Sequence, residues 1–427
     1  MSILTCHCLR SNRVGTQLCD SGEYSARKSE TKLNVVTPTS TCDLCGNIMA
    51  NIDYDLNSKH YQLLRAICQA YDGTATIYLA KYLPADSYVA VSRTNLDAVH
   101  EGFSVLQYEF YLMRLMQNEN ILALNKTFVT HNELWVVMPL MDLGSARDVL
   151  DNAYPDGLPE VIISYILRDT LQGLDYLHRM GYVHRSVNTS HILLSKSGNV
   201  KLAGLRTAVS MLIEGKLLRA VHDFPTHAVK LLPWLAPEVL EQNLLGYDTK
   251  SDIYSIGITA CELANGCVPF CDMVPMKMLL EKINGTTPKL LDSSTLVSDE
   301  QGGSVVDSGL GSSNVASGSK QVDQNPFTRL FSPQFHHFIE VCLTQDPANR
   351  PSASALLNHA FFKQVKKRTS ETLFPFFQNL TSLTEMKSDE DQGMQLQFVE
   401  KRNPPKKRKV RCIARLCIVF FNFQLHS

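Results

Sequence analysis

The pattern of apolar residues changes character once along this chain, near Leu150, and that change constrains the fold more than any other feature. Before it, runs such as Ala75 to Lys81, Tyr88 to Ser92 and Leu134 to Met138 have the length and β-branched content of strands. After it, apolar residues recur at helical spacing over longer stretches, for example from Val161 to Arg179. The sequence therefore predicts a small sheet followed by a helical part.

Composition narrows the class of protein. The 427 residues, 44% of them apolar, can form one large two-lobed domain or two to three ordinary ones. The 41 basic and 42 acidic residues nearly cancel, so bulk charge does not favour nucleic acid or a membrane surface as the main partner. Twelve scattered cysteines, without an apolar leader, predict a reduced cytoplasmic or nuclear setting, and their spacing does not predict a metal site.

The domain boundaries follow shifts in composition. Residues 1–58 are predicted as a disordered leader, and residues 363–427 as a tail that carries a basic cluster. Between them, residues 59–362 are predicted as one domain with a β-rich lobe (59–141) and a helical lobe (142–362). A Ser-, Gly- and Asp-rich stretch at about 293–324 is predicted as a disordered insertion within this domain.

The segment Tyr182 to Ile192 reads Tyr-Val-His-Arg-Ser-Val-Asn-Thr-Ser-His-Ile, which resembles the catalytic loop of a protein kinase with two substitutions. Ser186 stands where a kinase has the aspartate that accepts the proton of the substrate hydroxyl, and His191 stands where it has a metal-binding asparagine. Serine has no carboxylate at neutral pH, and histidine is a poor ligand for magnesium. The sequence therefore predicts a loop of the kinase type that lacks the side chains needed for phosphoryl transfer.

The nucleotide-binding positions are altered too. The phosphate-binding hairpin reads Cys68-Gln-Ala70-Tyr-Asp-Gly73, so only the third of three glycines remains. Ser92 occupies the position of the phosphate-binding lysine. Arg93 follows it, but strand side chains alternate, so Arg93 is predicted to point away from the cleft. Glu109, which would pair with that lysine, is predicted to have lost its partner.

Gly204, in Gly204-Leu-Arg206, replaces the second metal ligand. Together these losses remove most of the electrostatic stabilisation that a kinase supplies, so no phosphoryl transfer is expected. A residually active kinase remains an alternative. It would require a substitute lysine near the phosphates, and the segment Cys68 to Thr76 contains none.

The residues that build a kinase frame are present. Ala236-Pro237-Glu238 and Arg350 are placed to form an ion pair, Asp252 is placed to anchor the catalytic loop, and His184 and Leu205 are placed between the lobes. The positions that would line a nucleotide pocket are Cys68, Ala70, Gly73, Ala90, Ser92, Met138, Pro139 and Met141. The sequence therefore predicts an α+β, bilobal protein-kinase fold.

From about Tyr61 to Lys363 the chain resembles the STE20-related adaptor pseudokinases, the STRAD family. The resemblance is carried by Gly181-Tyr-Val-His-Arg-Ser186, Gly204-Leu-Arg206, Val221-His-Asp-Phe-Pro225 and Pro233-Trp-Leu235. The opening Met-Ser-Ile-Leu-Thr-Cys6 and Val306-Asp-Ser-Gly-Leu310 resemble the beta branch more than the alpha branch.

The resemblance implies a function that the altered site alone does not. It implies a closed, active-like pseudokinase that binds a client serine/threonine kinase, liver kinase B, as a pseudosubstrate. It further implies allosteric activation of that client, a helical-repeat scaffold called mouse protein twenty-five as third member, and movement of the client from nucleus to cytoplasm. A signalling scaffold in cell-survival pathways, which binds its client without activating it, remains an alternative.

The client is expected to dock where a kinase substrate would lie. Aromatic and arginine side chains favour interface cores, which selects Tyr176, Arg206, His222, Phe224 and Leu232 as candidates. An alternative is that Phe224 and Leu232 only pack the activation segment.

The resemblance also implies ATP binding without magnesium, although Cys68, Ala70 and Ser92 depart from the family. The family's terminal Trp-Glu-Phe, which docks on the scaffold, is absent, because the two tryptophans are Trp135 and Trp234. Weaker scaffold binding is therefore expected. Pro404-Pro-Lys-Lys-Arg-Lys-Val410 resembles a nuclear-import signal, with a solvated tail as the alternative. No apolar segment is long enough to span a membrane, and cytoplasm and nucleus are the expected locations.

Overall fold

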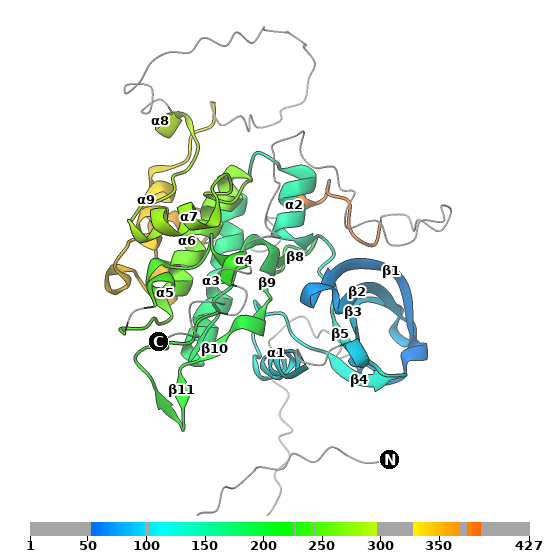
Figure 1. Cartoon of the computed structure of the whole chain (residues 1–427). Coiled ribbons are helices and arrows are strands. Elements are labelled where there is room, and N and C mark those ends of the chain that lie inside the picture. The colour runs from blue at the N-terminus through cyan, green and yellow to red at the C-terminus, as the bar shows by residue number, and fades with distance from the viewer. Residues whose placement is uncertain are drawn as a thin grey trace, which may run out of the picture. The chain divides into compact units, whose positions relative to one another are not determined.

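The computed structural model describes residues 53–98, 103–225, 228–242, 244–296, 328–366 and 374–385. They belong to one structural unit that begins at Asp53. Five antiparallel strands and one helix form its N-terminal lobe, and most of the remaining helices form the C-terminal lobe (Figure 1). The predicted α+β, bilobal fold is confirmed, whereas residues 1–52 and most of the predicted insertion and tail lie outside the described residues.

The N-terminal sheet has the strand order β1-β2-β3-β5-β4. Its strands are β1 (Tyr61–Ala70), β2 (Ala75–Tyr82), β3 (Ser87–Asn95), β4 (Lys126–Thr130) and β5 (Glu133–Pro139). Alternation along β3 separates two apolar clusters, because successive side chains point to opposite faces. Val89 and Val91 pack with Trp135 on one face, whereas Ala90 contributes to the main core on the other.

Helix α1 (Phe103–Leu115) covers the face of the sheet that bears Ala90. Leu112 and Met113 of this helix are buried in the same core as Ala90 and Val136 of the sheet. Ser92, two residues after Ala90, therefore projects toward the side of the sheet that α1 covers. This packing places α1 beside the positions that would bind a nucleotide.

The C-terminal lobe is built around α6 (Lys250–Asn265), whose residues from Ser251 to Ala264 are all buried. Because a helix buried on every side must be surrounded, neighbouring helices cover it, chiefly α3 (Glu160–Arg179) and α9 (Pro333–Cys342). The other helices after the N-terminal lobe are α2 (Ala146–Ala153), α4 (Ala228–Leu231), α5 (Pro237–Glu241), α7 (Pro275–Ile283), α8 (Ser293–Leu296), α10 (Ala353–Leu356) and α11 (Phe374–Phe377).

Short strands and 3-10 turns occur in the connections between the longer elements of both lobes. The strands are β6 (Gly144–Ser145), β7 (Tyr182–Val183), β8 (Ile192–Leu194), β9 (Val200–Leu202), β10 (Val209–Ser210), β11 (Leu212–Ile213) and β12 (Lys216–Leu217). The turns are η1 (Ser58–His60), η2 (Tyr71–Gly73), η3 (Leu83–Ala85), η4 (Leu96–Ala98), η5 (Thr189–His191), η6 (Leu205–Thr207), η8 (Pro347–Asn349) and η9 (Ala360–Gln364).

The predicted pair between Glu238 and Arg350 forms. Two guanidinium nitrogens of Arg350 donate to the two carboxylate oxygens of Glu238 at 2.6 and 2.7 Å, and both residues are buried. Arg350 also donates to the carbonyls of Thr344 and Gln345. This pair ties α5, which follows the activation segment, to the C-terminal helices.

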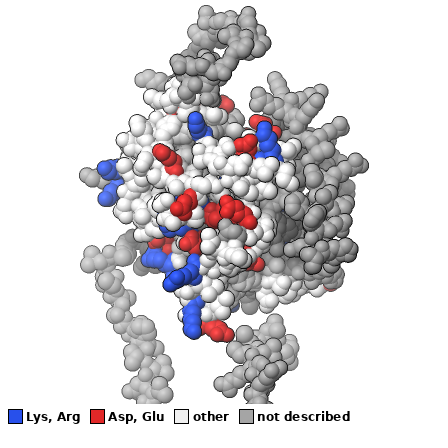
Figure 2. Space-filling model, turned by 60° about the vertical axis from the view of Figure 1, so that its left-hand side comes forward, with Lys and Arg blue, Asp and Glu red and all other residues white. Residues whose placement is uncertain are grey.

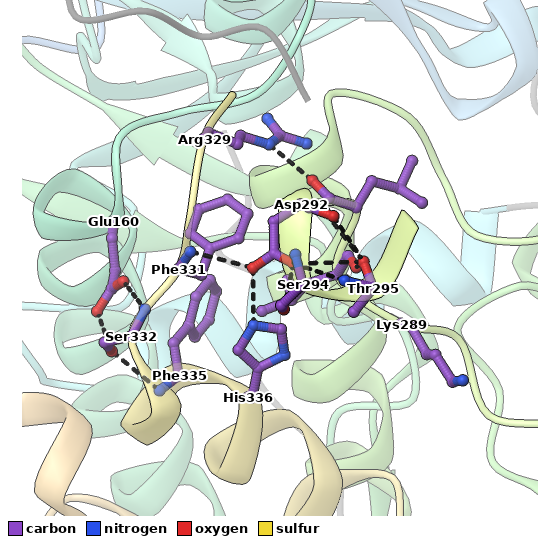
Figure 3. Close-up of polar contacts among 12 residues, drawn as sticks. Glu160, Lys289, Asp292, Ser294, Thr295, Arg329, Phe331, Ser332, Phe335 and His336 are labelled. Atoms are coloured by element: carbon purple, nitrogen blue, oxygen red, sulfur yellow. Dashed lines mark hydrogen bonds and ion pairs between the residues drawn. The ribbon is translucent and has the colours of Figure 1, made fainter. Parts of the chain in front are cut away.

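A buried carboxylate joins the two ends of the insertion. Asp292 accepts hydrogen bonds from Ser294 on one side, and from the Phe331 N–H and His336 Nε2 on the other (Figure 3). Arg329 donates to the carbonyl of Leu291, which brings the same two ends together. The described residues on either side of this stretch therefore lie together in the helical lobe.

Two segments that the sequence assigns to the leader and the tail are part of this unit. Tyr54 packs its ring on Tyr82, with centroids 5.0 Å apart, so the folded part begins before residue 59. Leu383 donates its N–H to the carbonyl of Asp142 and accepts from Arg65 of β1. The sequence did not predict that these segments are folded, because both are polar and neither has a helical or strand period. No helix among the described residues is long and apolar enough to cross a membrane.

Candidate functional site: a degenerate kinase cleft

The catalytic-loop backbone is held by one buried carboxylate, as predicted. Asp252 of α6 accepts hydrogen bonds from the N–H groups of His184 and Arg185, each at 2.8 Å, and from His178 Nε2 at 2.8 Å. Burial alone would raise the pKa of Asp252, but its hydrogen bonds and the charge of His178 hold that pKa below its usual value. Burial lowers the pKa of His184 to about 4, so this imidazole is neutral at pH 7, and its Nε2 lies 3.0 Å from the carbonyl oxygen of Ala203.

The two altered positions of the loop contact each other. Ser186 Oγ lies 2.9 Å from Nδ1 of His191, and the carbonyl oxygen of Ser186 lies 2.7 Å from the same nitrogen. Burial lowers the pKa of His191, which keeps its ring neutral. A hydroxyl and a neutral imidazole bound to each other do not form the carboxylate base of a kinase.

His191 also occupies space next to Gly204. A Cβ atom added to Gly204 would lie 2.7 Å from Cγ and from Nδ1 of His191. Gly204 has φ +81°, a backbone conformation that glycine adopts more readily than other residues. The substitutions at the two metal-ligand positions are therefore complementary. The ring of His191 occupies the space that a side chain at position 204 would need.

Magnesium does not fit this donor set. Magnesium prefers carboxylate and other hard oxygen ligands in octahedral geometry, and here Ser186, His191 and Gly204 provide a hydroxyl, an imidazole and no side chain. Within the described residues no group of three or more His, Cys, Asp or Glu side chains is placed to hold a metal.

The position of the missing lysine is buried. Ser92 is 2% exposed, and its Oγ finds no hydrogen-bond partner in the described part of the chain. Arg93 points to the opposite face, as predicted, where it donates to Glu133 at 2.6–2.9 Å and lies over the ring of Trp135. Arg93 therefore does not replace the lysine.

Glu109 has partners, which corrects the prediction that it had lost them. Its carboxylate accepts hydrogen bonds from the Tyr71 hydroxyl and from the backbone N–H of Arg206. Burial raises the pKa of Glu109, and these contacts oppose that rise. Tyr71, at the tip of the phosphate-binding hairpin, is a site residue that sequence reasoning missed, since attention went to the glycines on either side of it.

The predicted pocket residues divide into two groups. Ala90, Met138 and Met141 are buried in the main core, and Pro139 is half-buried at the end of β5. Cys68 and Gly73 are exposed and Ala70 is half-buried, all on the hairpin between β1 and β2. The expected hinge positions thus lie in or next to the main core at the end of β5, and the hairpin positions lie at and beside the turn between β1 and β2.

The activation segment is held by contacts of its own. Arg185 has φ +65° and donates to the carbonyl of Thr207, to the carboxylate of Asp223 and to the hydroxyl of Tyr247. The segment also pairs with Tyr247 through Val221, whose N–H donates to the Tyr247 carbonyl at 2.8 Å. The carboxylate of Asp223 forms an ion pair with Arg185, so this part of the segment is fixed without a phosphate group.

The five predicted docking residues lie in different surroundings. His222 and Phe224 are exposed on the activation segment, and the ring of His222 lies against Gly246. Leu232 is 8% exposed and belongs to the main core. Tyr176 is half-buried in α3 and its hydroxyl accepts from the N–H of Gln117, whereas the guanidinium of Arg206 lies over the ring of Tyr71.

Further apolar side chains are exposed on the activation segment that carries His222 and Phe224. The exposed fractions are 42% for Leu212, 57% for Ile213, 67% for Leu217 and 58% for Val229, compared with 39% for Phe224. The first three lie on the β11–β12 hairpin, which projects from the activation segment (Figure 1). Short, half-polar strands carry little sequence signal, so the hairpin could not be assigned from the sequence.

Charge is mixed on the face of the molecule that Figure 2 shows. Acidic and basic side chains are interspersed there, with uncharged surface between them. This distribution agrees with the formal net charge of −1 and does not indicate a single-sign surface on that face.

The fold and the altered cleft define a class, the pseudokinases, and comparison with known proteins agrees. Residues 72–362 match the model of the protein kinase domain. The chain is 50% identical to the human STE20-related kinase adapter protein alpha over 341 residues, which are 78% of this chain and 79% of the relative. It is 39% identical to the mouse STE20-related kinase adapter protein beta over 388 residues, 88% of this chain and 91% of the relative.

The chain belongs to the STE20-related kinase adapter family. The predicted family is confirmed. The predicted closeness to the beta branch is not supported, because identity to the alpha relatives is higher. That prediction relied on two short segments, Met1 to Cys6 and Val306 to Leu310, which both lie outside the described residues.

Proposed function

We propose that this chain is a catalytically inactive adaptor that binds a client serine/threonine kinase in the manner of a substrate and raises its activity. One observation carries the proposal: the activation segment is fixed by Arg185, Asp223 and Tyr247 while it exposes Phe224 and further apolar side chains. A fixed backbone with exposed apolar side chains costs little entropy to dock. The client proposed is liver kinase B, and the third member of the complex is the scaffold called mouse protein twenty-five.

The activation is a shift of population. A partner that binds only the active conformer of its client raises the occupancy of that conformer by its differential affinity. A tenfold rise in activity requires about 1.4 kcal/mol of preference for the active conformer. Burying a few of the exposed side chains at an interface supplies free energy of this order.

Phosphoryl transfer by this chain is not part of the proposal. Ser92, Ser186, His191 and Gly204 stand at the positions of the lysine, the aspartate and the two metal ligands, and Arg93 points away from them. Without these charges the transferring phosphoryl group has little electrostatic stabilisation. In this proposal, any ATP bound without magnesium serves a structural role only.

The docking face can be tested by reconstitution. Purified client and scaffold are mixed with this chain or with a His222→Ala/Phe224→Ala variant, and both client binding and client activity are measured. Val129→Ala is the matched control, because Val129 is also exposed, at 61%, but lies on β4 outside the activation segment. We expect the double variant to lose binding and activation together and the control to keep both. A double variant that activates fully would refute the docking face.

The compartment is a separate part of the proposal. We propose that the chain occurs in nucleus and cytoplasm, and that the basic cluster from Pro404 to Val410 supports nuclear import; this cluster lies outside the described residues. Replacing its lysines with alanine should move a fluorescently tagged chain toward the cytoplasm. An unchanged distribution would contradict the role of the cluster.

A further inference from the structure

The tip of the β1–β2 hairpin directs one tyrosine toward α1 and the start of the activation segment. Tyr71 has φ +54°, in the left-handed region that bulky side chains rarely adopt. Its ring meets Phe110 of α1 edge to face, with centroids 6.4 Å apart, and its hydroxyl donates to Glu109. Burial raises the pKa of this hydroxyl well above its usual value, so it stays protonated and remains a donor.

Arg206 closes the other side of this cluster. Its guanidinium carbon lies 5.5 Å from the centroid of the Tyr71 ring, within the range of a cation–π contact. Its backbone N–H donates to Glu109. Because Arg206 lies two residues after Gly204, the cluster joins α1, the hairpin and the start of the activation segment.

The same place lacks the lysine of a kinase. In a kinase, the lysine on the third strand contacts both the nucleotide phosphates and the glutamate of the helix that corresponds to α1 here. Here Ser92 Oγ and Glu109 Oε2 are both buried, and neither has a hydrogen-bond partner among the described residues. Glu109 is instead reached by a hydroxyl that comes from the hairpin. The hairpin is the element that would otherwise cover the phosphates.

We propose that Tyr71 replaces both the missing lysine and the nucleotide phosphates: it anchors α1 through Glu109, and it fills the phosphate end of the cleft. The active-like position of α1 is then kept by the chain itself, without nucleotide. ATP can bind only when Tyr71 leaves, so ATP and the Tyr71–Glu109 contact exclude each other. This inference concerns the cleft and does not depend on the client.

Two variants separate the roles of the ring and the hydroxyl. Tyr71→Ala removes both, whereas Tyr71→Phe keeps the ring in the cleft and removes only the hydrogen bond to Glu109. Tyr88→Ala is the control for loss of a tyrosine, because Tyr88 is 46% exposed on β3. The full chain is melted with and without ATP in the presence of EDTA, and hydrogen exchange of the α1 amides is measured without nucleotide.

ATP should leave the melting temperature of the unaltered chain and of Tyr88→Ala unchanged. At about 100 times its dissociation constant it should raise that of Tyr71→Ala by about 5 °C or more. Amides of α1 should exchange faster in both Tyr71 variants than in the unaltered chain.

An equal ATP shift in the unaltered chain and in Tyr71→Ala would overturn the exclusion of ATP. Exchange of α1 that is the same in the unaltered chain and in Tyr71→Phe would overturn the anchoring role. If Tyr71→Ala does not fold, a clear ATP shift of the unaltered chain still overturns the exclusion, and Tyr71→Phe still tests the anchor.

Discussion

Restoring one metal ligand should destabilise this protein, because the other ligand position has been filled. In a Gly204→Asp variant the new Cβ would lie 2.7 Å from Cγ and Nδ1 of His191 and 2.9 Å from Cδ2. Overpacking of this kind costs about 1–3 kcal/mol. A non-glycine residue at φ +81° adds about 1–2 kcal/mol. We therefore expect a loss of about 2–5 kcal/mol in the free energy of unfolding.

A double-mutant cycle separates the two costs. His191→Ala removes all three atoms that the new Cβ would meet, so the steric part of the Gly204→Asp penalty should disappear in that background. The backbone part should remain. The expected coupling energy is about 1–3 kcal/mol, measured by urea unfolding followed through the fluorescence of Trp135 and Trp234. Equal penalties in both backgrounds would refute the reasoning that His191 and Gly204 are matched.

Three further predictions follow from contacts outside that pair. Glu238→Gln leaves the guanidinium of Arg350 buried without its counter-charge and should cost about 3–5 kcal/mol in urea unfolding. Although burial opposes the effect, hydrogen bonds from Ser294, the Phe331 N–H and His336 lower the pKa of Asp292 from 3.8 to about 2. The stabilisation that the Asp292 carboxylate provides is complete above its usual pKa and should be lost as the pH falls toward 2. The Asp292→Asn variant should lack this pH dependence of the melting temperature. Asp223→Asn removes the charge opposite Arg185 and should speed amide exchange in the activation segment, while stability changes by less than about 1 kcal/mol because Asp223 is 63% exposed.

Each of these three predictions would be contradicted by a specific result. A loss below about 1 kcal/mol for Glu238→Gln would show that the carbonyl acceptors of Arg350 suffice on their own. Melting temperatures that fall equally with pH in the original chain and in Asp292→Asn would assign the acid sensitivity to other groups. Unchanged exchange in Asp223→Asn would show that Tyr247 and the Thr207 carbonyl hold the segment without Asp223.

Motif order and strand alternation predicted much of the fold and part of the cleft. The order of the landmarks fixed the bilobal architecture, and the alternation of β3 correctly turned Arg93 away from the cleft. The pair of Glu238 and Arg350 was also predictable, because both residues stand at positions whose partners are set by the fold. These inferences depend on periodicity and spacing, which the sequence displays directly.

Contacts made by single side chains across loops were not predictable in the same way. The contacts of Tyr71 with α1 and Arg206 depend on a left-handed backbone at Tyr71, a position that is not glycine. Asp223 was visible in the sequence, but its approach to Arg185 depends on the path of the activation segment. Leu383 contacts Asp142 from a polar stretch without any period. Each of these contacts is set by tertiary packing.

The central claim, activation of a client without phosphoryl transfer, is tested most directly by one paired measurement. This chain, the scaffold and Mg-ATP are incubated with active client to measure its activity, and with catalytically dead client to measure its intact mass. We expect the activity of the active client to rise while the mass of the dead client stays unchanged. Added phosphate on the dead client, or binding without any rise in activity, would contradict the account.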